Sequence, residues 1–147
     1  MEKVKIRTAG KGDISYLLGL AEEFMPKEAS RESRTAILKD SLANPHYELF
    51  VADLDGKVIG FIDHWITADF THGGRSSFIH NLFVMPRYRR RGIGSRLLRK
   101  VIGSSMKKGI IEIHVATEFD NKTAIALYKS HGLTNEALQL EMEIEQE

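Results

Sequence analysis

The sequence has 147 residues, of which 42% are hydrophobic and 28% charged, with a formal net charge of +1 and no cysteine. This length and composition suit one folded domain, so we expect a single domain over residues 1–147. The small net charge gives no general argument for nucleic-acid binding, and the lack of cysteine excludes disulfides, thiolate metal sites and a cysteine nucleophile. No signal-peptide core and no apolar run of membrane-spanning length is found, which favours a cytoplasmic protein.

The N-terminal part of the chain predicts a strand followed by two helices. Residues 3–9 alternate charged and apolar side chains, as a half-buried strand does. Asp13 is expected to cap a first helix that ends near Pro26, and Ser30 is expected to begin a second one. The sequence Asn-Pro-His at 44–46 breaks this second helix.

The middle of the chain predicts a hairpin, a long strand, a helix and a further strand. Asp55-Gly56 lies between two β-rich runs and indicates a tight hairpin turn. A polar loop over 69–77 separates this hairpin from a long apolar strand over 77–85. The amphipathic pattern over 92–106 predicts a helix, and the run over 109–118 predicts another strand.

The last part of the chain predicts a helix over 120–132 and a strand over 138–145, where apolar and polar residues alternate. The element order is therefore β-α-α-β-β-β-α-β-α-β. This order indicates an α/β (α+β) fold with a mixed, mostly antiparallel central sheet flanked by helices. The strand-helix-strand step from Phe78 to Thr117 should be a right-handed parallel crossover.

The segment from Arg87 to Lys100 carries seven basic residues and no acidic one, at the point where a strand is followed by a helix. Backbone N–H groups in the first turn of a helix have no intrahelical partner and attract anions. Gly92 and Gly94 lack the Cβ atoms that would hold an anion away, although glycine destabilises a helix by roughly 0.5–1 kcal/mol relative to alanine. The pattern therefore fits a phosphate site.

Other interpretations of this segment remain open at this point. It can be a solvated, basic helix start whose glycines serve packing. A dinucleotide site requires a third glycine where Leu97 stands, and a Walker phosphate loop requires a sequence that is absent. A nucleic-acid surface fits the local charge, but Tyr88 is the only aromatic residue among the arginines.

Two motifs about thirty residues apart carry a resemblance to a known family. Residues 89–94 read RRRGIG, and residues 121–133 read NKTAIALYKSHGL. They resemble the R/Q-x-x-G-x-G/A signature and the second motif of the GNAT superfamily, the acetyl-CoA-dependent N-acetyltransferases, and the likeness covers nearly the whole chain. It implies a three-layer GNAT-like fold, acetyl-CoA as cofactor, coenzyme A as product, and direct acetyl transfer to a primary amine in a ternary complex. The alternative is a non-catalytic acyl-CoA-binding module, because the acidic residue that many members carry on the central strand is missing.

The same resemblance implies which residues hold the cofactor. The main chain of Leu82 and Val84 would pair with the pantetheine arm, and an amide near Leu82 would stabilise the thioester oxygen as it gains charge. Asn121 would hydrogen-bond the arm, although it can also be a plain N-cap of the last helix. The full set of expected cofactor contacts is Leu82, Phe83, Val84, Arg89, Arg90, Arg91, Gly92, Ile93, Gly94, Ser95 and Asn121.

Two catalytic residues are implied as well. Tyr128 would protonate or hydrogen-bond the leaving thiolate, although it can instead be a core residue of its helix. His80 interrupts an apolar strand, as in the arylalkylamine branch of the superfamily, and would accept a proton from the amine. The alternative for His80 is a buried, hydrogen-bonded histidine, while His114 on the next strand and water compete with it as the base.

The acceptor is expected to be a small-molecule or peptide amine whose pocket is shaped by residues 24–30, residues 67–76 and the C-terminal strand. Asp63 and His64 are expected to end the preceding strand and to line that pocket. The six histidines show no compact ligand spacing, so we expect no metal. The five glutamates after Gly132 would attract a cationic acceptor or simply face solvent. Members of the family often form dimers, so a homodimer is left open, as are the acceptor's identity and the length of the acyl chain.

Overall fold

The computed structural model describes residues 3–146, which form two compact units that divide after Val115. The first unit holds a five-stranded sheet with the strand order β1-β2-β3-β4-β5. Its strands are β1 (Val4–Thr8), β2 (Tyr47–Leu54), β3 (Lys57–Asp69), β4 (Gly74–Val84) and β5 (Glu112–Val115). Neighbouring strands pair antiparallel except for β4 and β5, which are parallel. The predicted mixed, mostly antiparallel sheet is confirmed.

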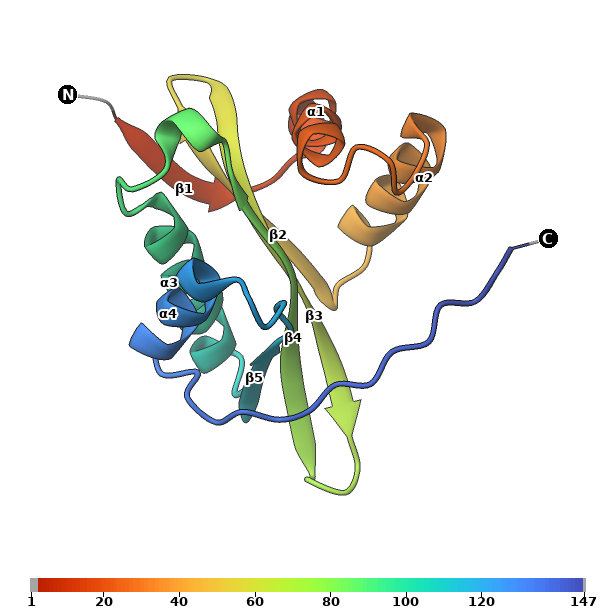
Figure 1. The fold of residues 1–147 in the computed structure, drawn as a ribbon, viewed down its shortest axis with the longest axis vertical. Helices are drawn as coiled ribbons and strands as arrows, with labels where there is room; N and C mark the ends of the chain where they lie inside the picture. The colour runs from red at the N-terminus through yellow and green to blue at the C-terminus, as the bar shows by residue number, and fades with distance from the viewer. Residues whose placement is uncertain (1–2, 147) are drawn as a thin grey trace. The chain divides into compact units, whose positions relative to one another are not determined.

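Helices cover both faces of this sheet. In the first unit, α1 (Ile14–Phe24) and α2 (Arg31–Leu42) lie on one face and α3 (Ile93–Lys107) lies on the other, as Figure 1 shows. Helix α3 connects β4 to the parallel β5, which is the predicted crossover. The second unit contains α4 (Lys122–Ser130). The predicted three-layer α/β fold is therefore confirmed. In the part of the chain that the structure describes, no helix combines the length and the apolar character that crossing a membrane would need.

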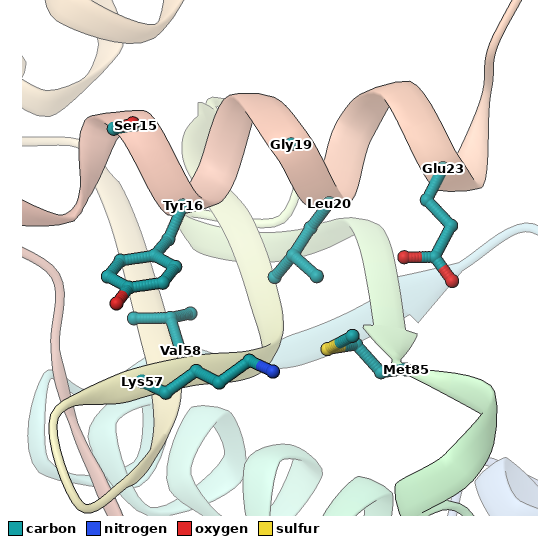
Figure 2. A pocket seen from close by; sticks show the side chains of 8 residues that line it. All are labelled: Ser15, Tyr16, Gly19, Leu20, Glu23, Lys57, Val58 and Met85. Atoms are coloured by element: carbon teal, nitrogen blue, oxygen red, sulfur yellow. The ribbon is translucent and has the colours of Figure 1, made fainter.

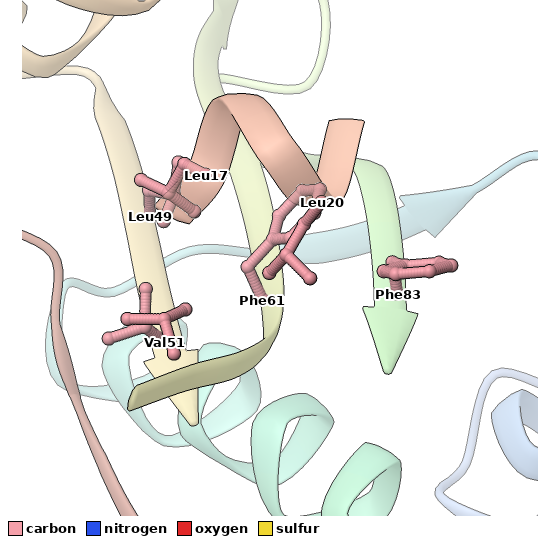
Figure 3. Close-up of a cluster of buried hydrophobic side chains, with 7 residues drawn as sticks. Leu17, Leu20, Leu49, Val51, Phe61 and Phe83 are labelled. Carbon is pink, nitrogen blue, oxygen red and sulfur yellow. The ribbon is translucent and has the colours of Figure 1, made fainter. Parts of the chain in front are cut away.

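The core beneath α1 joins this helix to three strands. Leu17 and Leu20 lie about one turn apart on α1 and therefore point to the same side of the helix (Figure 3). Leu49 and Val51 are two residues apart on β2 and share one face of the sheet. Each buried aliphatic or phenylalanine side chain contributes roughly 1.5–3 kcal/mol, so the cluster fixes α1 over the sheet. Its members are Leu17, Leu20, Leu49, Val51, Val58, Phe61 and Phe83.

Two local predictions are confirmed at short range. The turn between β2 and β3 has positive φ at both central residues, 49° at Asp55 and 91° at Gly56, as a tight hairpin with the sheet's twist requires. The Gly56 amide also donates to Asp53 Oδ1 at 2.7 Å. At the start of α2, Ser30 Oγ accepts from the Ser33 amide at 3.1 Å, which makes Ser30 the N-cap.

The predicted cap of α1 is wrong. Asp13 ends a short 3-10 helix (Lys11–Asp13) and makes no side-chain bond to the first turn of α1. Its carboxylate instead accepts from both terminal nitrogens of Arg7 at 2.8 Å and from the Gly10 amide at 2.7 Å. A paired guanidinium is a stronger partner than a neutral backbone amide, so the ion pair with β1 outcompetes the cap.

The predicted loop over 69–77 is shorter in the structure. Strand β3 continues to Asp69 and β4 begins at Gly74, so the polar residues in between form only a turn. Residues Thr67 and Ser76 face each other in the antiparallel ladder. Pairing between two adjacent strands therefore extends both of them into a sequence whose composition alone is typical of a loop.

The predicted C-terminal strand is also wrong. Within the described residues after Gly132, which end at 146, none belongs to a strand. The alternating apolar side chains of this segment are exposed. They are Leu138, Leu140, Met142 and Ile144. Alternation fulfils the side-chain pattern of a strand, but a strand also needs a hydrogen-bonding neighbour, and the described part of the second unit contains none.

Candidate active site

Strand β4 changes its surroundings halfway along its length. It pairs with β3 from Gly74 to Val84, whereas its parallel pairing with β5 covers only Ser76–Ile79. From His80 to Val84, the edge of β4 that faces away from β3 has no strand partner among the described residues of the first unit. This open edge exposes main-chain donors and acceptors to an extended ligand.

A β-bulge marks the point where the edge opens. Asp63 pairs with Asn81 and His64 pairs with Ile79, so His80 has no opposite residue on β3. Bulges bend a strand and redirect its side chains, and they are frequent beside active sites. The His80 side chain is exposed, so the alternative of a buried histidine is wrong.

Both histidines considered as a base lie next to one ring. His80 meets Phe78 edge-on at a centroid distance of 6.2 Å, and His114 stacks on Phe78 at 5.3 Å. His114 Nε2 lies 3.6 Å from Glu112 Oε2, so it already faces a carboxylate on its own strand. Across residues 3–146, no group of three His, Cys, Asp or Glu side chains comes together in a way that could hold a metal ion.

The amides of the open half alternate in direction. The Asn81 amide points to β3, where it donates to Asp63 Oδ1 at 2.9 Å, and the Met85 amide donates to Ile59 O on the same strand at 2.9 Å. Because successive amides of a strand point to opposite edges, those of Leu82 and Val84 face the open edge.

The turn after β4 leads into α3 through left-handed backbone. After a 3-10 helix (Pro86–Tyr88), φ is 64° at Arg90 and 77° at Gly92, the N-cap of α3. A Cβ built on Gly92 would meet no atom within 4 Å, so glycine serves the backbone angle there and the adjacent space is open. Left-handed residues of this kind shape turns whose amides form anion-binding concavities.

The first turn of α3 adds further amide donors next to this left-handed turn. Arg96 N bonds Gly92 O at 3.1 Å and closes the first helical turn. The amides of residues 93–95 precede that bond, and the amides of a first helical turn have no intrahelical acceptor. The N-cap is a glycine and offers them no side chain. The predicted phosphate site therefore has the required main chain.

The arginines of the turn lie along aromatic rings. The guanidinium groups of Arg87 and Arg91 lie 5.1 and 5.6 Å from the ring centre of the buried Tyr88. Arg89 lies 5.4 Å from the ring centre of Phe83, and its Nε donates to Val84 O at 2.7 Å. Rings fix the positions of these cations next to the helix N-terminus, where they favour an anion. Tyr88 is thus a platform for the turn rather than a base-stacking residue.

Asp63 lies in the middle of β3 rather than at its end and is only 7% exposed. Its Oδ1 accepts from the Asn81 amide at 2.9 Å and from Asn81 Nδ2 at 3.0 Å, and its Oδ2 accepts from the Tyr47 hydroxyl. Burial raises the pKa of Asp63, while these hydrogen bonds act in the opposite direction. The sequence offered one signal for this contact, a polar residue in each of two adjacent apolar strands.

His64 does not line a pocket, because it is fully buried. Its Nδ1 lies 2.7 Å from Ser77 Oγ, and its Nε2 lies 2.9 Å from Glu48 Oε1, which also accepts from Ser104 Oγ at 2.6 Å. Burial lowers the pKa of His64, so the ring is neutral, donates from Nε2 to Glu48 and accepts at Nδ1 from Ser77. Although the order Ser-His-Glu resembles a nucleophilic triad, Ser77 is 0% exposed and no substrate reaches it.

A cavity of about 250 Å³ lies beside α1 (Figure 2). Leu20, Val58 and Met85 form its apolar part, and the side chains of Lys57 and Glu23 stand at its sides. Its volume is below the roughly 300–1,000 Å³ of typical small-molecule pockets. The segments expected to shape the acceptor pocket do not line it, so the cavity supports no acceptor site.

In the second unit, the two predicted site residues belong to α4. Asn121 is the N-cap, since its Oδ1 accepts from the Ala124 amide at 3.2 Å. Tyr128 is 7% exposed, and burial raises its pKa to about 12. The phenol is therefore protonated at neutral pH. The helix ends at Ser130, two residues before Gly132, which has a φ of 100°.

An open strand edge that continues into a glycine-capped helix start defines a site for an extended ligand that carries an anion. A model of the Acetyltransferase (GNAT) family matches residues 14–133. The chain belongs to this family and is an acetyl-CoA-dependent N-acetyltransferase of amine substrates. The prediction of an enzyme is thereby confirmed.

Similar proteins agree with this assignment. The thialysine N-epsilon-acetyltransferases of Bos taurus and Sus scrofa are 30% and 29% identical over 145 and 146 residues, which is 90% of this chain and 85% of each relative. Aminoglycoside N(6')-acetyltransferase type 1 of Salmonella enteritidis is 28% identical over 130 residues, covering 86% of this chain and 89% of the relative. The solved structure of aminoglycoside N-acetyltransferase AAC(6')-Iy in complex with CoA shares the fold with a TM-score of 0.85 at 24% identity, covering 99% of this chain and 97% of that one.

Proposed function

We propose that this enzyme transfers acetyl directly from acetyl-CoA to the primary amine of a small cationic molecule, in a ternary complex without an acyl-enzyme. The names of its curated relatives, which act on thialysine and on aminoglycosides, specify a nitrogen as the acceptor. The observation that carries the proposal is the edge of β4, which opens at His80 and leads to the left-handed turn at Gly92.

The main chain of this edge and turn fits coenzyme A. The amides of Leu82 and Val84 would bind the pantetheine arm as a neighbouring strand would, and those of residues 93–95 would bind the diphosphate. Arg89 already occupies Val84 O, so the Val84 amide is the group that remains for the arm. The open space beside Gly92 matches an anion's approach.

The remaining predicted contacts have narrower functions. Phe83 is 6% exposed, packs in the core and turns its main chain toward Phe61 on β3, so it would support the two contacting residues beside it rather than contact the cofactor itself. Asn121 uses its Oδ1 as the cap of α4 and would offer Nδ2 to the arm. Arg90 and Arg91 would add positive charge at the turn.

Acetyl-CoA, when bound, supplies an acetyl group activated as a thioester. His80, or a water that it holds, accepts a proton from the substrate ammonium and frees the nitrogen lone pair. The Leu82 amide donates to the carbonyl oxygen while the C–N bond forms; one such donor is worth roughly 3–4 kcal/mol in comparable sites. Tyr128 would give its phenolic proton to the sulfur as the C–S bond breaks. The nitrogen would then release its second proton through water to the Tyr128 phenolate, which leaves an amide, a thiol, the restored phenol and a protonated His80 that loses its proton to solvent.

A thiol-release screen tests this proposal. The purified chain would be given acetyl-CoA with diamines, polyamines, lysine analogues, aminoglycosides, peptides and neutral amines. We expect release that depends on a cationic amine, with intersecting initial-velocity lines when both substrates vary. Release without amine dependence across the panel, or parallel lines typical of an acyl-enzyme, contradicts the proposal.

Tyr128→Phe tests the thiolate donor separately. Burial raises the pKa of Tyr128 to about 12, so the phenol keeps a proton that it can donate to the sulfur. Removing its hydroxyl should therefore lower kcat at least tenfold, with little change in the KM for acetyl-CoA. Tyr88→Phe is the matched control: it also removes a hydroxyl from a buried tyrosine but keeps the ring along which Arg87 and Arg91 lie, so kcat should not change. Equal kcat for Tyr128→Phe and the parent removes Tyr128 from the mechanism.

We also propose that the protein forms a homodimer and lies in the cytoplasm. Light scattering of the purified chain decides the first, with a mass of about twice 16.6 kDa expected for a dimer. Cell fractionation decides the second.

A further inference from the structure

The bulge leaves His80 without an opposite residue on β3, and a side chain of β3 bonds the residue that follows it. The Asn81 amide, directly after the bulge, donates to the carboxylate of Asp63 at 2.9 Å. The side chain of Asn81 bonds the same oxygen through Nδ2 at 3.0 Å. Two bonds to one carboxylate therefore fix both the main chain and the side chain of the residue between His80 and Leu82.

A second strand supports this carboxylate from the other side. Tyr47 on β2 donates its hydroxyl to Asp63 Oδ2. The Tyr47 ring is itself held against Trp65 at a centroid distance of 4.8 Å. Tyr47, Asp63 and Asn81 thus form one chain of hydrogen bonds across β2, β3 and β4, which we call the bulge clamp.

The carboxylate of the bulge clamp is held by hydrogen bonds rather than by an ion pair with lysine or arginine. All the donors described above are neutral, and within residues 3–146 no lysine or arginine forms an ion pair with Asp63. The ionisable groups that act on it are Tyr47 on β2, His80 on β4 and the adjacent His64 on β3. A buried carboxylate without a counter-ion destabilises a fold, and such groups concentrate at functional sites.

We infer that Asp63 is a positioning residue: through Asn81 it holds the β4 bulge so that His80 and the Leu82 amide face the open edge in register for acetyl transfer. This inference rests on the proposed functions of His80 and Leu82. Small displacements of reacting groups, of the order of 1 Å, reduce rates about 10²-fold, so rigidity at this one peptide has a large effect. Strand β4 lacks the acidic residue that many family members carry there. Asp63 on the neighbouring β3 is an acidic residue at the same place, but it positions β4 and does not act as a base.

Four variants test the clamp through activity. Asp63→Ala should lower kcat about 50- to 100-fold and change the KM for acetyl-CoA less than threefold. Asp63→Asn keeps an oxygen for the Asn81 amide and should recover kcat to within about fivefold of the parent, with an unchanged pH profile. Ser77→Ala also removes a buried polar group between β3 and β4 and should leave kcat unchanged. If Asp63→Ala does not fold, Asn81→Ala replaces it, with an expected tenfold loss of kcat.

Amide hydrogen exchange tests the clamp without any substrate. In the free protein, Asp63→Ala should accelerate exchange at Asn81 at least tenfold and leave the amides of β2 at parent rates, whereas Ser77→Ala should leave Asn81 protected. Unchanged exchange at Asn81, or equal losses of kcat in Asp63→Ala and Ser77→Ala, overturns the inference. A parent enzyme without amine-dependent thiol release contradicts the proposed function instead, and the exchange measurement still decides the clamp.

Discussion

The two halves of β4 have the same neighbour on one edge and different surroundings on the other. From Ser76 to Ile79 the strand lies between β3 and β5. From His80 to Val84 only β3 pairs with it among the described residues of the first unit. The first half therefore uses its main chain for the sheet. In the second half, the donors and acceptors that face away from β3 have no strand partner in the first unit, and we propose that the cofactor binds them. One strand can serve both fold and site because its partner ends early.

Two adjacent residues of β3 show the same difference in their side chains. His64 joins Ser77 of the first half to Glu48, and Lys108 also approaches Glu48 at 3.2 Å. Every member of this network is satisfied within the protein. Asp63 instead acts on the second half, at Asn81, next to exposed groups. Polar groups in the enclosed half stabilise the fold, whereas those in the open half direct the main chain that faces the ligand.

The largest expected effect comes from removing one donor of the open edge. Leu82→Pro deletes an amide that faces away from β3, and proline is tolerated where a strand's amide is unpaired. We expect a folded protein whose kcat falls about 10²- to 10³-fold, because the donor to the thioester oxygen is lost. Circular dichroism and thiol release check both parts.

Leu82→Ala is the matched control for this proline, because it trims the side chain and keeps the amide. It should retain most of the activity. If Leu82→Pro unfolds the chain, the Leu82 amide belongs to the sheet and the two halves of β4 do not differ as described. If Leu82→Pro is folded and fully active, the amide has no part in catalysis.

A smaller effect is expected where the open edge ends, at Gly92. Gly92→Ala makes the left-handed backbone about 1–2 kcal/mol less favourable, and it places a methyl group in the open space where we propose that the anion binds. We expect a lower Tm and an acetyl-CoA Kd raised about tenfold by calorimetry. Gly103→Ala lies inside α3 with equal space and should stabilise the protein by roughly 0.5–1 kcal/mol at an unchanged Kd. Identical behaviour of the two variants argues against an anion site at the turn.

Features formed by neighbouring residues could be predicted from the sequence. The Asp55-Gly56 hairpin, the Ser30 cap and the glycine turn before α3 each depend on a few consecutive side chains and their backbone angles. The family resemblance added the expectation that this turn binds coenzyme A. These parts of the fold, including the backbone of the turn, could be predicted because local chemistry alone determines them.

Features that depend on register could not be predicted. The bulge at His80 and the end of β5 at Val115 follow from how separate strands align, and no local pattern encodes that. Asp63 was expected at a strand end because a polar residue in an apolar run is typical of one. Its partner Asn81, which allows it to lie inside β3, is distant in sequence. The same reason explains the error at Asp13, whose competing partner Arg7 belongs to another element. Alternation over 138–145 has no such partner, and no strand forms.

Within the enclosed half of β4, substitutions should change stability rather than activity. Ser77→Ala leaves Nδ1 of the buried His64 without a partner, which destabilises the fold by roughly 1–3 kcal/mol. The urea midpoint should fall while kcat and both KM values stay at parent levels. Ser76→Ala, one residue earlier and on the other face of β4, should alter the midpoint little. A loss of kcat in Ser77→Ala would show that the halves are coupled.

The smallest expected effect is a dependence of stability on pH that originates in the same enclosed network. Burial lowers the pKa of His64, although Glu48 opposes this shift. For Glu48, burial acts to raise the pKa, but bonds from Ser104, Lys108 and His64 hold it below its ordinary value. A group with a lowered folded pKa stabilises the native state above its unfolded pKa and loses that contribution as the pH falls.

Stability should therefore begin to fall below about pH 6.5, by at most ~1.4 kcal/mol per pH unit for one proton, and fall further below about pH 4.3. Urea titrations between pH 8 and pH 5 check the first step, which His64→Gln should abolish because glutamine binds no proton. If the dependence of stability on pH is unchanged in His64→Gln, another group titrates in this range, and the assignment of a neutral His64 to the enclosed network is wrong.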